Sequence, residues 1–170
     1  MVEQQEASED AVMTRIGQAV MLLHGGDREE ARNRFGLLWS ELGADGDGLH
    51  RCTLAHYMAD TQDDPGDELA WDLRALTAAE GLMSGERSAG HRDSLAVQAF
   101  YPSLHLNLAA DYLKLQRPDA ARIHLRQARD AADALKDGGH GGHGGYGGYS
   151  GYDAGVRAAI ERLELRMRGM

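Results

Sequence analysis

The stretch that decides the fold is "HLNLAADYLKLQRPDAARIHLRQA", residues 105–128, in which two helical patterns flank one short break. Apolar residues recur every three or four positions on both sides of "QRP" at 116–118, which is the spacing of amphipathic helices. Pro118 suits the first turn of a helix, where its missing N–H removes no hydrogen bond. The stretch therefore predicts an antiparallel hairpin of two helices, over about 94–115 and 118–137.

The same helical spacing recurs through the rest of the chain. It predicts further helices over about 6–24, 27–42, 49–61, 65–83 and 154–168. In the helix over 65–83, the leucine spacing predicts that Leu69, Leu73 and Leu76 pack against Ala55 and Met58 of the helix before it. Glycine-rich or acidic breaks separate them, and the polar segment 84–93 is predicted to be a loop. No segment shows the two-residue alternation of a half-buried strand, so the predicted fold class is all-α.

An internal repeat relates the first and the last predicted hairpins at an offset of 90 residues. Both hairpins carry two alanines that are twelve positions apart, followed by a large apolar residue. A small residue on each helix lets the two backbones approach closely, and bulky residues nearby fill the space beside the crossing. The matching residues are Ala19, Ala31 and Phe35 in the first hairpin and Ala109, Ala121 and Leu125 in the last.

These positions resemble the tetratricopeptide repeat (TPR), a helical-repeat family that is common in bacterial proteins. The segment "HLNLAADY" at 105–112 carries the bulky, Leu, small, Tyr order of that repeat, with His105 in place of the usual Trp. The resemblance implies a short right-handed TPR-like solenoid of three stacked hairpins over 1–136. A flexible linker over 137–153 and a capping helix over 154–170 would complete the same domain.

The resemblance also implies a concave groove, lined by the first helix of each hairpin, that receives a peptide or a partner protein. Asn107 matches a position at which many family members bind the backbone of a peptide. The Lys and Arg positions of the family's carboxylate clamp are not reproduced, which disfavours capture of an acidic C-terminal tail in this groove. For the apolar positions, core packing is the alternative interpretation. The predicted groove residues are Met13, Ile16, Val20, Thr53, His56, Asp60, Asn107, Ala110 and Lys114.

Cys52, His56 and Asp60 lie four residues apart on one predicted helix, so their side chains share a face. A thiolate, an imidazole and a carboxylate at this spacing could provide two or three ligands to zinc. The alternative is structural: Cys52 as a small buried side chain and His56 as a hydrogen-bond partner of Asp60. The structural alternative is favoured, so no metal site is predicted here.

The segment "DGGHGGHGGYGGYSGYDAG", residues 137–155, is dense in glycine, with His140 and His143 followed by regularly spaced tyrosines. Dense glycine opposes regular structure because ordering its backbone costs the most entropy. The favoured interpretation is a passive linker. Weak binding of Ni, Cu or Zn by His140 and His143, and adhesive contact through the aromatic rings, are the alternatives.

Composition narrows the classes of partner. A formal net charge of −9 opposes direct binding to nucleic acid or to an anionic membrane surface. No leader-like segment or long apolar run is present, and the single Cys52 precludes an internal disulfide, so we expect a cytoplasmic protein. No cofactor-binding or catalytic motif is recognised, and we expect a chain that is not an enzyme.

Together these features predict an adaptor or scaffold that binds a protein or peptide partner. Two alternatives come from other classes. One is a metal-responsive protein that uses the His- and Tyr-containing segment. The other is a regulatory module that acts together with a separate DNA-binding protein.

Overall fold

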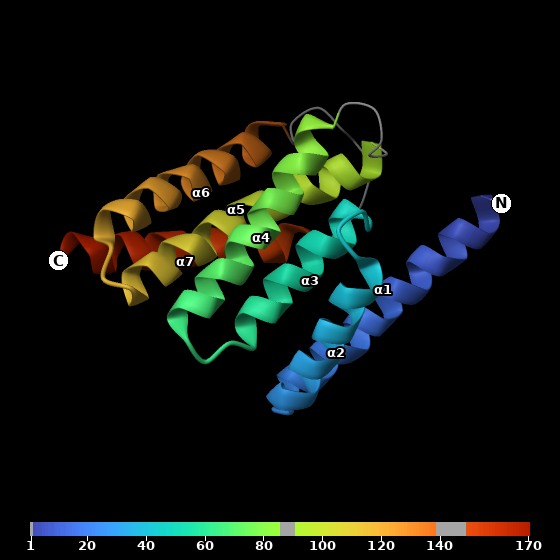
Figure 1. Cartoon of the computed structure of the whole chain (residues 1–170). Helices are drawn as coiled ribbons and strands as arrows, with labels where there is room; N and C mark the ends of the chain where they lie inside the picture. The colour runs from blue at the N-terminus through green and yellow to red at the C-terminus, as the bar shows by residue number, and fades with distance from the viewer. Residues whose placement is uncertain (1, 86–90, 139–148) are drawn as a thin grey trace. The chain divides into compact units, whose positions relative to one another are not determined.

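The computed structural model describes the backbone of residues 2–85, 91–138 and 149–170, and the side chains of 11–85, 95–137 and 154–170 (Figure 1). This part of the chain contains seven α-helices and no strand, which confirms the all-α class. The helices are α1 (Val2–His24), α2 (Arg28–Leu42), α3 (Gly48–Asp60), α4 (Pro65–Ser84), α5 (His91–Lys114), α6 (Pro118–Gly138) and α7 (Tyr149–Arg168). Consecutive helices pack as the predicted pairs α1 with α2, α3 with α4, and α5 with α6. Their assembly into a TPR-like solenoid stays a prediction.

Internal contacts divide the chain into two compact units, Met1–Ser84 (unit 1) and Gly85–Met170 (unit 2). Unit 1 contains α1 to α4, and α2 packs on both α1 and α3. Unit 2 contains α5, α6 and α7, and α7 packs on both helices of the hairpin. None of the described helices is both long enough and apolar enough to cross a bilayer.

The first hairpin forms because its turn residues stop one helix and start the next. Gly26 has a φ of 93°, a left-handed conformation that glycine adopts without strain. The carboxylate of Asp27 then accepts a hydrogen bond from the N–H of Glu30 at 3.3 Å and caps α2. Ala19 and Ala31 are fully buried in the apolar cluster that joins the two helices, as the spacing predicted. Figure 1 shows that the first part of α1 extends beyond the end of α2.

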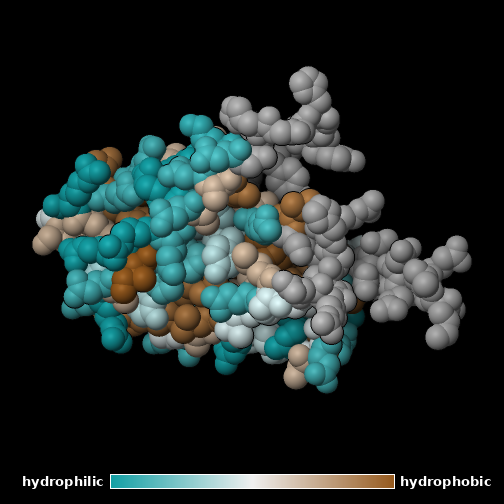
Figure 2. Space-filling view, turned by 90° about the horizontal axis from the view of Figure 1, so that it is seen from above, coloured by the Kyte–Doolittle hydropathy of each residue, from teal (hydrophilic) through white to brown (hydrophobic). Residues whose placement is uncertain are grey.

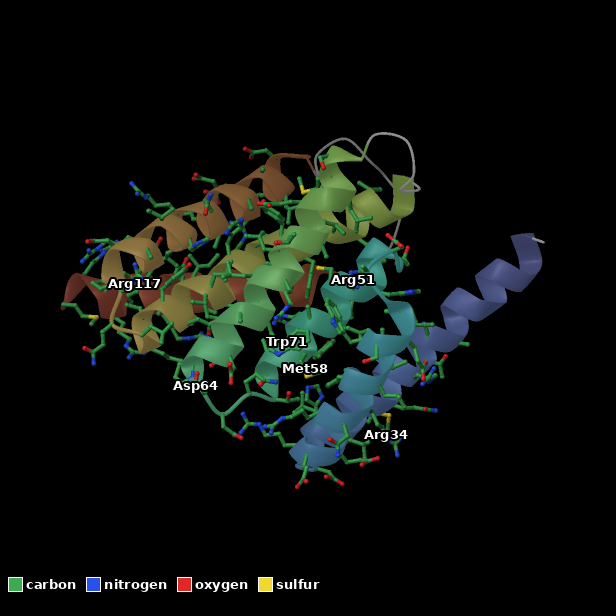
Figure 3. All side chains as sticks on the ribbon, viewed as in Figure 1. Arg34, Arg51, Met58, Asp64, Trp71 and Arg117 are labelled. Atoms are coloured by element: carbon green, nitrogen blue, oxygen red, sulfur yellow. The ribbon has the colours of Figure 1, made fainter. Side chains whose placement is uncertain are left out.

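The core of unit 1 lies where α1, α2 and α3 meet. Phe35 is fully buried at its centre, and Met58 and Trp71 pack into it from α3 and α4 (Figure 3). Trp71 contacts Trp39 edge to face, with ring centroids 5.1 Å apart. At the start of α3, a Cβ atom on Gly48 would lie 2.8 Å from the side chain of Leu82, so a larger residue here would force Leu82 to shift.

The inner face of α4 differs from the predicted one. The leucine spacing predicted that Leu69, Leu73 and Leu76 would face α3, but Leu73 is exposed. The face that the structure buries consists of Asp72, Ala75, Leu76 and Ala79. The alanines explain this rotation, because they let α3 and α4 approach more closely than a row of leucines would.

The hairpin of unit 2 reproduces the turn of the first hairpin at an offset of 90 residues. The N–H of Asp27 donates to the carbonyl of Leu22 at 2.9 Å, and the N–H of Arg117 donates to that of Tyr112 at 2.8 Å. Gln116 takes the left-handed conformation that Gly26 has in the first turn, with a φ of 58°. The two turns therefore share one geometry, although only one of them contains glycine.

The last helix packs its apolar stripe onto the hairpin of unit 2. Ile160 and Met167 are buried with Ala109, Ala121 and Leu125 in one cluster. Two ion pairs join α6 and α7: Arg129 makes a bidentate pair with Glu164, and Arg157 pairs with Asp133 at 2.9 Å. The backbone of α7 is helical from Tyr149, five residues before the predicted 154.

Candidate partner-binding site

The groove residues predicted on α1 divide between core and surface. Ile16 is only 2 % exposed, and Val20 packs against the same cluster, so both side chains stabilise unit 1. Core packing, the alternative interpretation of these two positions, describes them better than contact with a partner does. Met13 is 41 % exposed and keeps its side chain on the surface. Of the three, Met13 is the most exposed and Val20 is half-buried, and contact of either with a partner stays a prediction.

The predicted positions on α3 belong to a polar cluster with α4. The Thr53 hydroxyl donates to the carbonyl of Leu49 at 2.8 Å, within its own helix. His56 is half-buried, with its Nδ1 atom 3.9 Å from a carboxylate oxygen of the buried Asp72. The predicted partner of His56 was Asp60, so the structure adds a second acidic neighbour from α4. Burial raises the pKa of Asp60, and the positive charge on His56 opposes this rise.

Cys52 is fully buried in the same hairpin and is unsuited to metal binding. Burial, and next the charge of Asp72, raise the pKa of its thiol to about 12. A thiol with this pKa stays protonated at neutral pH, whereas zinc binds the thiolate. Within the described part of the chain, no group of three or more His, Cys, Asp or Glu side chains could hold a metal ion. His140 and His143 lie outside the described residues.

The predicted positions on α5 are accessible to different degrees. Asn107 and Ala110 are half-buried, and Lys114 is exposed, with its Nζ atom 3.9 Å from a carboxylate oxygen of the buried Asp111. Their contact with a partner stays a prediction. Since α5 belongs to unit 2 and α1 and α3 to unit 1, the structure describes the predicted groove as separate surfaces.

A histidine pair lies inside the hairpin of unit 2, next to these positions. The Nδ1 atoms of His105 and His124 are 3.0 Å apart, and His105 is only 2 % exposed. Tyr101 contacts His105 edge to face, and Tyr112 stacks on His124. Burial, and next the neighbouring His124, lower the pKa of His105 to about 4. These rings pack inside the hairpin of unit 2.

A surface hollow within unit 2 was not predicted from the sequence. It is a cleft of about 760 Å³ between α6 and α7, and we call it the arginine cleft. Leu125 and Met167, both largely buried, form its apolar floor. The remaining lining residues are charged: Arg122, Arg126, Arg129, Arg168 and Glu164. A cleft with an apolar floor and polar walls is the usual form of a binding site.

The ion pairs leave part of the positive charge of the arginine cleft unneutralised. Arg129 is held by Glu164, and Arg122 pairs with Asp119 at 2.8 Å. The side chains of Arg126 and Arg168 form no hydrogen bond or ion pair with any residue that the structure describes. The sequence feature that could have indicated this cleft is the spacing of Arg122, Arg126 and Arg129, which places three arginines on one face of α6.

Exposed apolar side chains do not by themselves mark a site on this molecule. On the face displayed in Figure 2, hydrophobic residues lie in small groups between hydrophilic ones. The most exposed large apolar side chains inside the described helices are Met21, Leu165 and Leu37. Single exposed apolar residues are common in folded proteins, so the arginine cleft is the more informative surface.

Comparison of the chain with protein-family models, with curated proteins and with solved structures found no match.

Proposed function

We propose that this chain is a non-enzymatic adaptor that binds a protein or peptide partner. The observation that carries the proposal is the arginine cleft, which combines an apolar floor with charged walls on the surface of unit 2. Partner-binding surfaces use such a combination, because buried apolar contacts supply affinity and charged groups at the rim supply specificity. Met13 on unit 1 and Lys114 on unit 2 are exposed predicted groove positions, and each is a further candidate contact on its own unit.

The chemistry of the other clusters agrees with a binding role. Cys52 is held as a neutral thiol, which is a poor nucleophile. His105 is held as a neutral imidazole with little access to solvent, so it is badly placed to exchange protons with a substrate. Both groups stabilise helix hairpins, and the charged surface is left to select a partner.

Photo-crosslinking in the native host tests the proposal. A photoreactive amino acid would replace Met13, Lys114 or Arg168, one position at a time. Thr77 is the control, since it is exposed on α4 and its hydroxyl bonds to the carbonyl of Leu73 in its own helix. We expect a discrete crosslinked product from at least one of the three positions and none from Thr77. If all four positions give the same products, or none, the adaptor function is wrong.

A further inference from the structure

We infer that the arginine cleft binds an acidic segment of the partner, in which carboxylate side chains flank a bulky apolar residue. This inference rests on the proposed function and specifies the chemistry of the partner. None of the cleft residues is among the predicted groove positions, so the cleft is a separate contact surface.

The charge of the cleft opposes the charge of the rest of the protein. The chain carries a formal net charge of −9, yet the cleft lining has four arginines and one glutamate, a net charge of +3. Glu164 is occupied by both prongs of Arg129, so it does not neutralise Arg126 or Arg168. An arginine side chain presents several N–H donors in a plane, a geometry that matches a carboxylate. Acidic side chains are therefore the complementary groups.

The cleft also supplies the apolar contact that the bulky residue of the proposed ligand needs. Leu125 and Met167, 5 % and 6 % exposed, lie between the arginines of α6 and Arg168 of α7. The aliphatic parts of the arginine side chains therefore supply most of the apolar surface of the cleft. A purely ionic ligand would leave this surface wet. A ligand with a leucine-sized side chain between its carboxylates would bury that surface and pair with Arg126 and Arg168 at the same time.

The length of the cleft sets the size of the ligand. The lining residues of α6 run from Arg122 to Arg129, and a helix rises about 1.5 Å per residue, so the floor is about 10 Å long. An extended peptide covers this distance with about three residues, and a helix with about two turns. The occupant is accordingly a short segment of a partner and not a whole domain face.

Peptide binding to the full chain tests the inference. The probe is a fluorescent 14-residue peptide with Glu and Leu at helical spacing, and its binding is followed by fluorescence anisotropy. A second peptide replaces every Glu by Lys, and a third replaces every Leu by Ser. We expect the Glu/Leu peptide to bind at low salt, the Lys peptide not to bind, and the Ser peptide to bind more weakly. Equal binding of the Glu/Leu and Lys peptides, or no binding of either, would overturn the inference.

Charge reversal locates the site. Arg126→Glu with Arg168→Glu should weaken binding of the Glu/Leu peptide by about tenfold or more, since two exposed ion pairs are lost and replaced by repulsion. Arg162→Glu is the matched control for Arg168→Glu, because Arg162 is exposed on the same helix and does not line the cleft. Circular dichroism confirms that the variants are folded. An equal loss of affinity in the control would overturn the assignment of the site.

Two further measurements distinguish the proposed acidic segment from other ligands of the cleft. If the parent sediments as a dimer that the double charge reversal dissociates, the occupant is a second copy of the chain and the inference is wrong. If millimolar inorganic phosphate displaces the peptide completely at constant ionic strength, the cleft is a general anion site and the inference also fails. A partner that crosslinks at Met13 or Lys114, without peptide binding to the cleft, removes only this inference. Absence of crosslinking at all tested positions removes the proposed function.

Discussion

Lowering the pH from 7.5 to 5 should destabilise the hairpin of unit 2 through His105. The imidazole is buried, its Nε2 atom has no hydrogen-bond partner, and its Nδ1 atom lies 3.0 Å from that of His124. While both rings are neutral, one Nδ1 donates and the other accepts. A proton taken up by His105 would place two N–H groups against each other or leave a charged N–H without an acceptor. The folded state therefore favours the neutral ring.

The magnitude follows from the difference between the folded and unfolded pKa values. The pKa of His105 falls from 6.5 to about 4 on folding, and each pKa unit corresponds to about 1.4 kcal/mol. Because the unfolded chain binds more protons between these values, stability is fully present above pH 6.5 and is lost as the pH falls towards 4. The total loss is about 3 kcal/mol, of which about 2 kcal/mol has occurred at pH 5.

Urea unfolding followed by circular dichroism, at pH 7.5 and pH 5, measures this loss in the parent and in His105→Gln. Glutamine removes the titrating group and can still bond to His124. Carboxylates contribute to the acid response of both proteins alike, so the difference between them isolates His105. The parent should lose about 2 kcal/mol more than the variant. NMR titration of the His105 ring gives the pKa directly. A ring that titrates near 6.5, or equal losses in both proteins, would refute the argument.

Three other predictions concern packing and backbone geometry. Ala109→Leu should overpack the α5–α6 crossing and lower the free energy of unfolding in urea by about 1 to 3 kcal/mol. Ala110→Leu is the control and should lower it less, because Ala110 is half-buried. Equal losses in the two variants would contradict the close crossing. Gln116→Gly should stabilise the chain by roughly 0.5 to 1 kcal/mol in the same assay, because Gln116 has a φ of 58°, and a destabilising effect would show that this turn is not left-handed in solution. Cys52 should react with Ellman's reagent only after unfolding, and fast reaction of the folded chain would disprove its burial and raised pKa.

The sequence was sufficient for those parts of the fold that depend on neighbours along the chain. Helix spacing, capping residues and turn residues act over a few positions, so the boundaries at the short turns could be predicted closely, whereas α1, α5 and α7 begin three to five residues before their predicted starts. The alanine pairs could also be predicted, because the repeat placed Ala19 with Ala31 and Ala109 with Ala121, and all four are fully buried. The wrong prediction concerned the rotation of α4. A row of leucines indicated one face, and the closer packing that alanines allow selected the face beside it.

The arginine cleft shows why the candidate site was harder to predict than the fold. Three of its arginines, Arg122, Arg126 and Arg129, lie at helical spacing on α6, and in the sequence alone such a stripe is typical of a solvated face. It becomes a cleft only because α7 packs beside α6 with Met167 next to Leu125, which joins residues about forty positions apart. The pairing of Arg129 with Glu164 then decides which charges remain available. Which arginine pairs with Glu164 depends on the register of α6 and α7, and that register is set by the apolar stripe of α7. The selectivity proposed for the cleft is thus fixed by packing beneath it, and a change in Ile160 or Met167 should alter ligand binding without removing any charge.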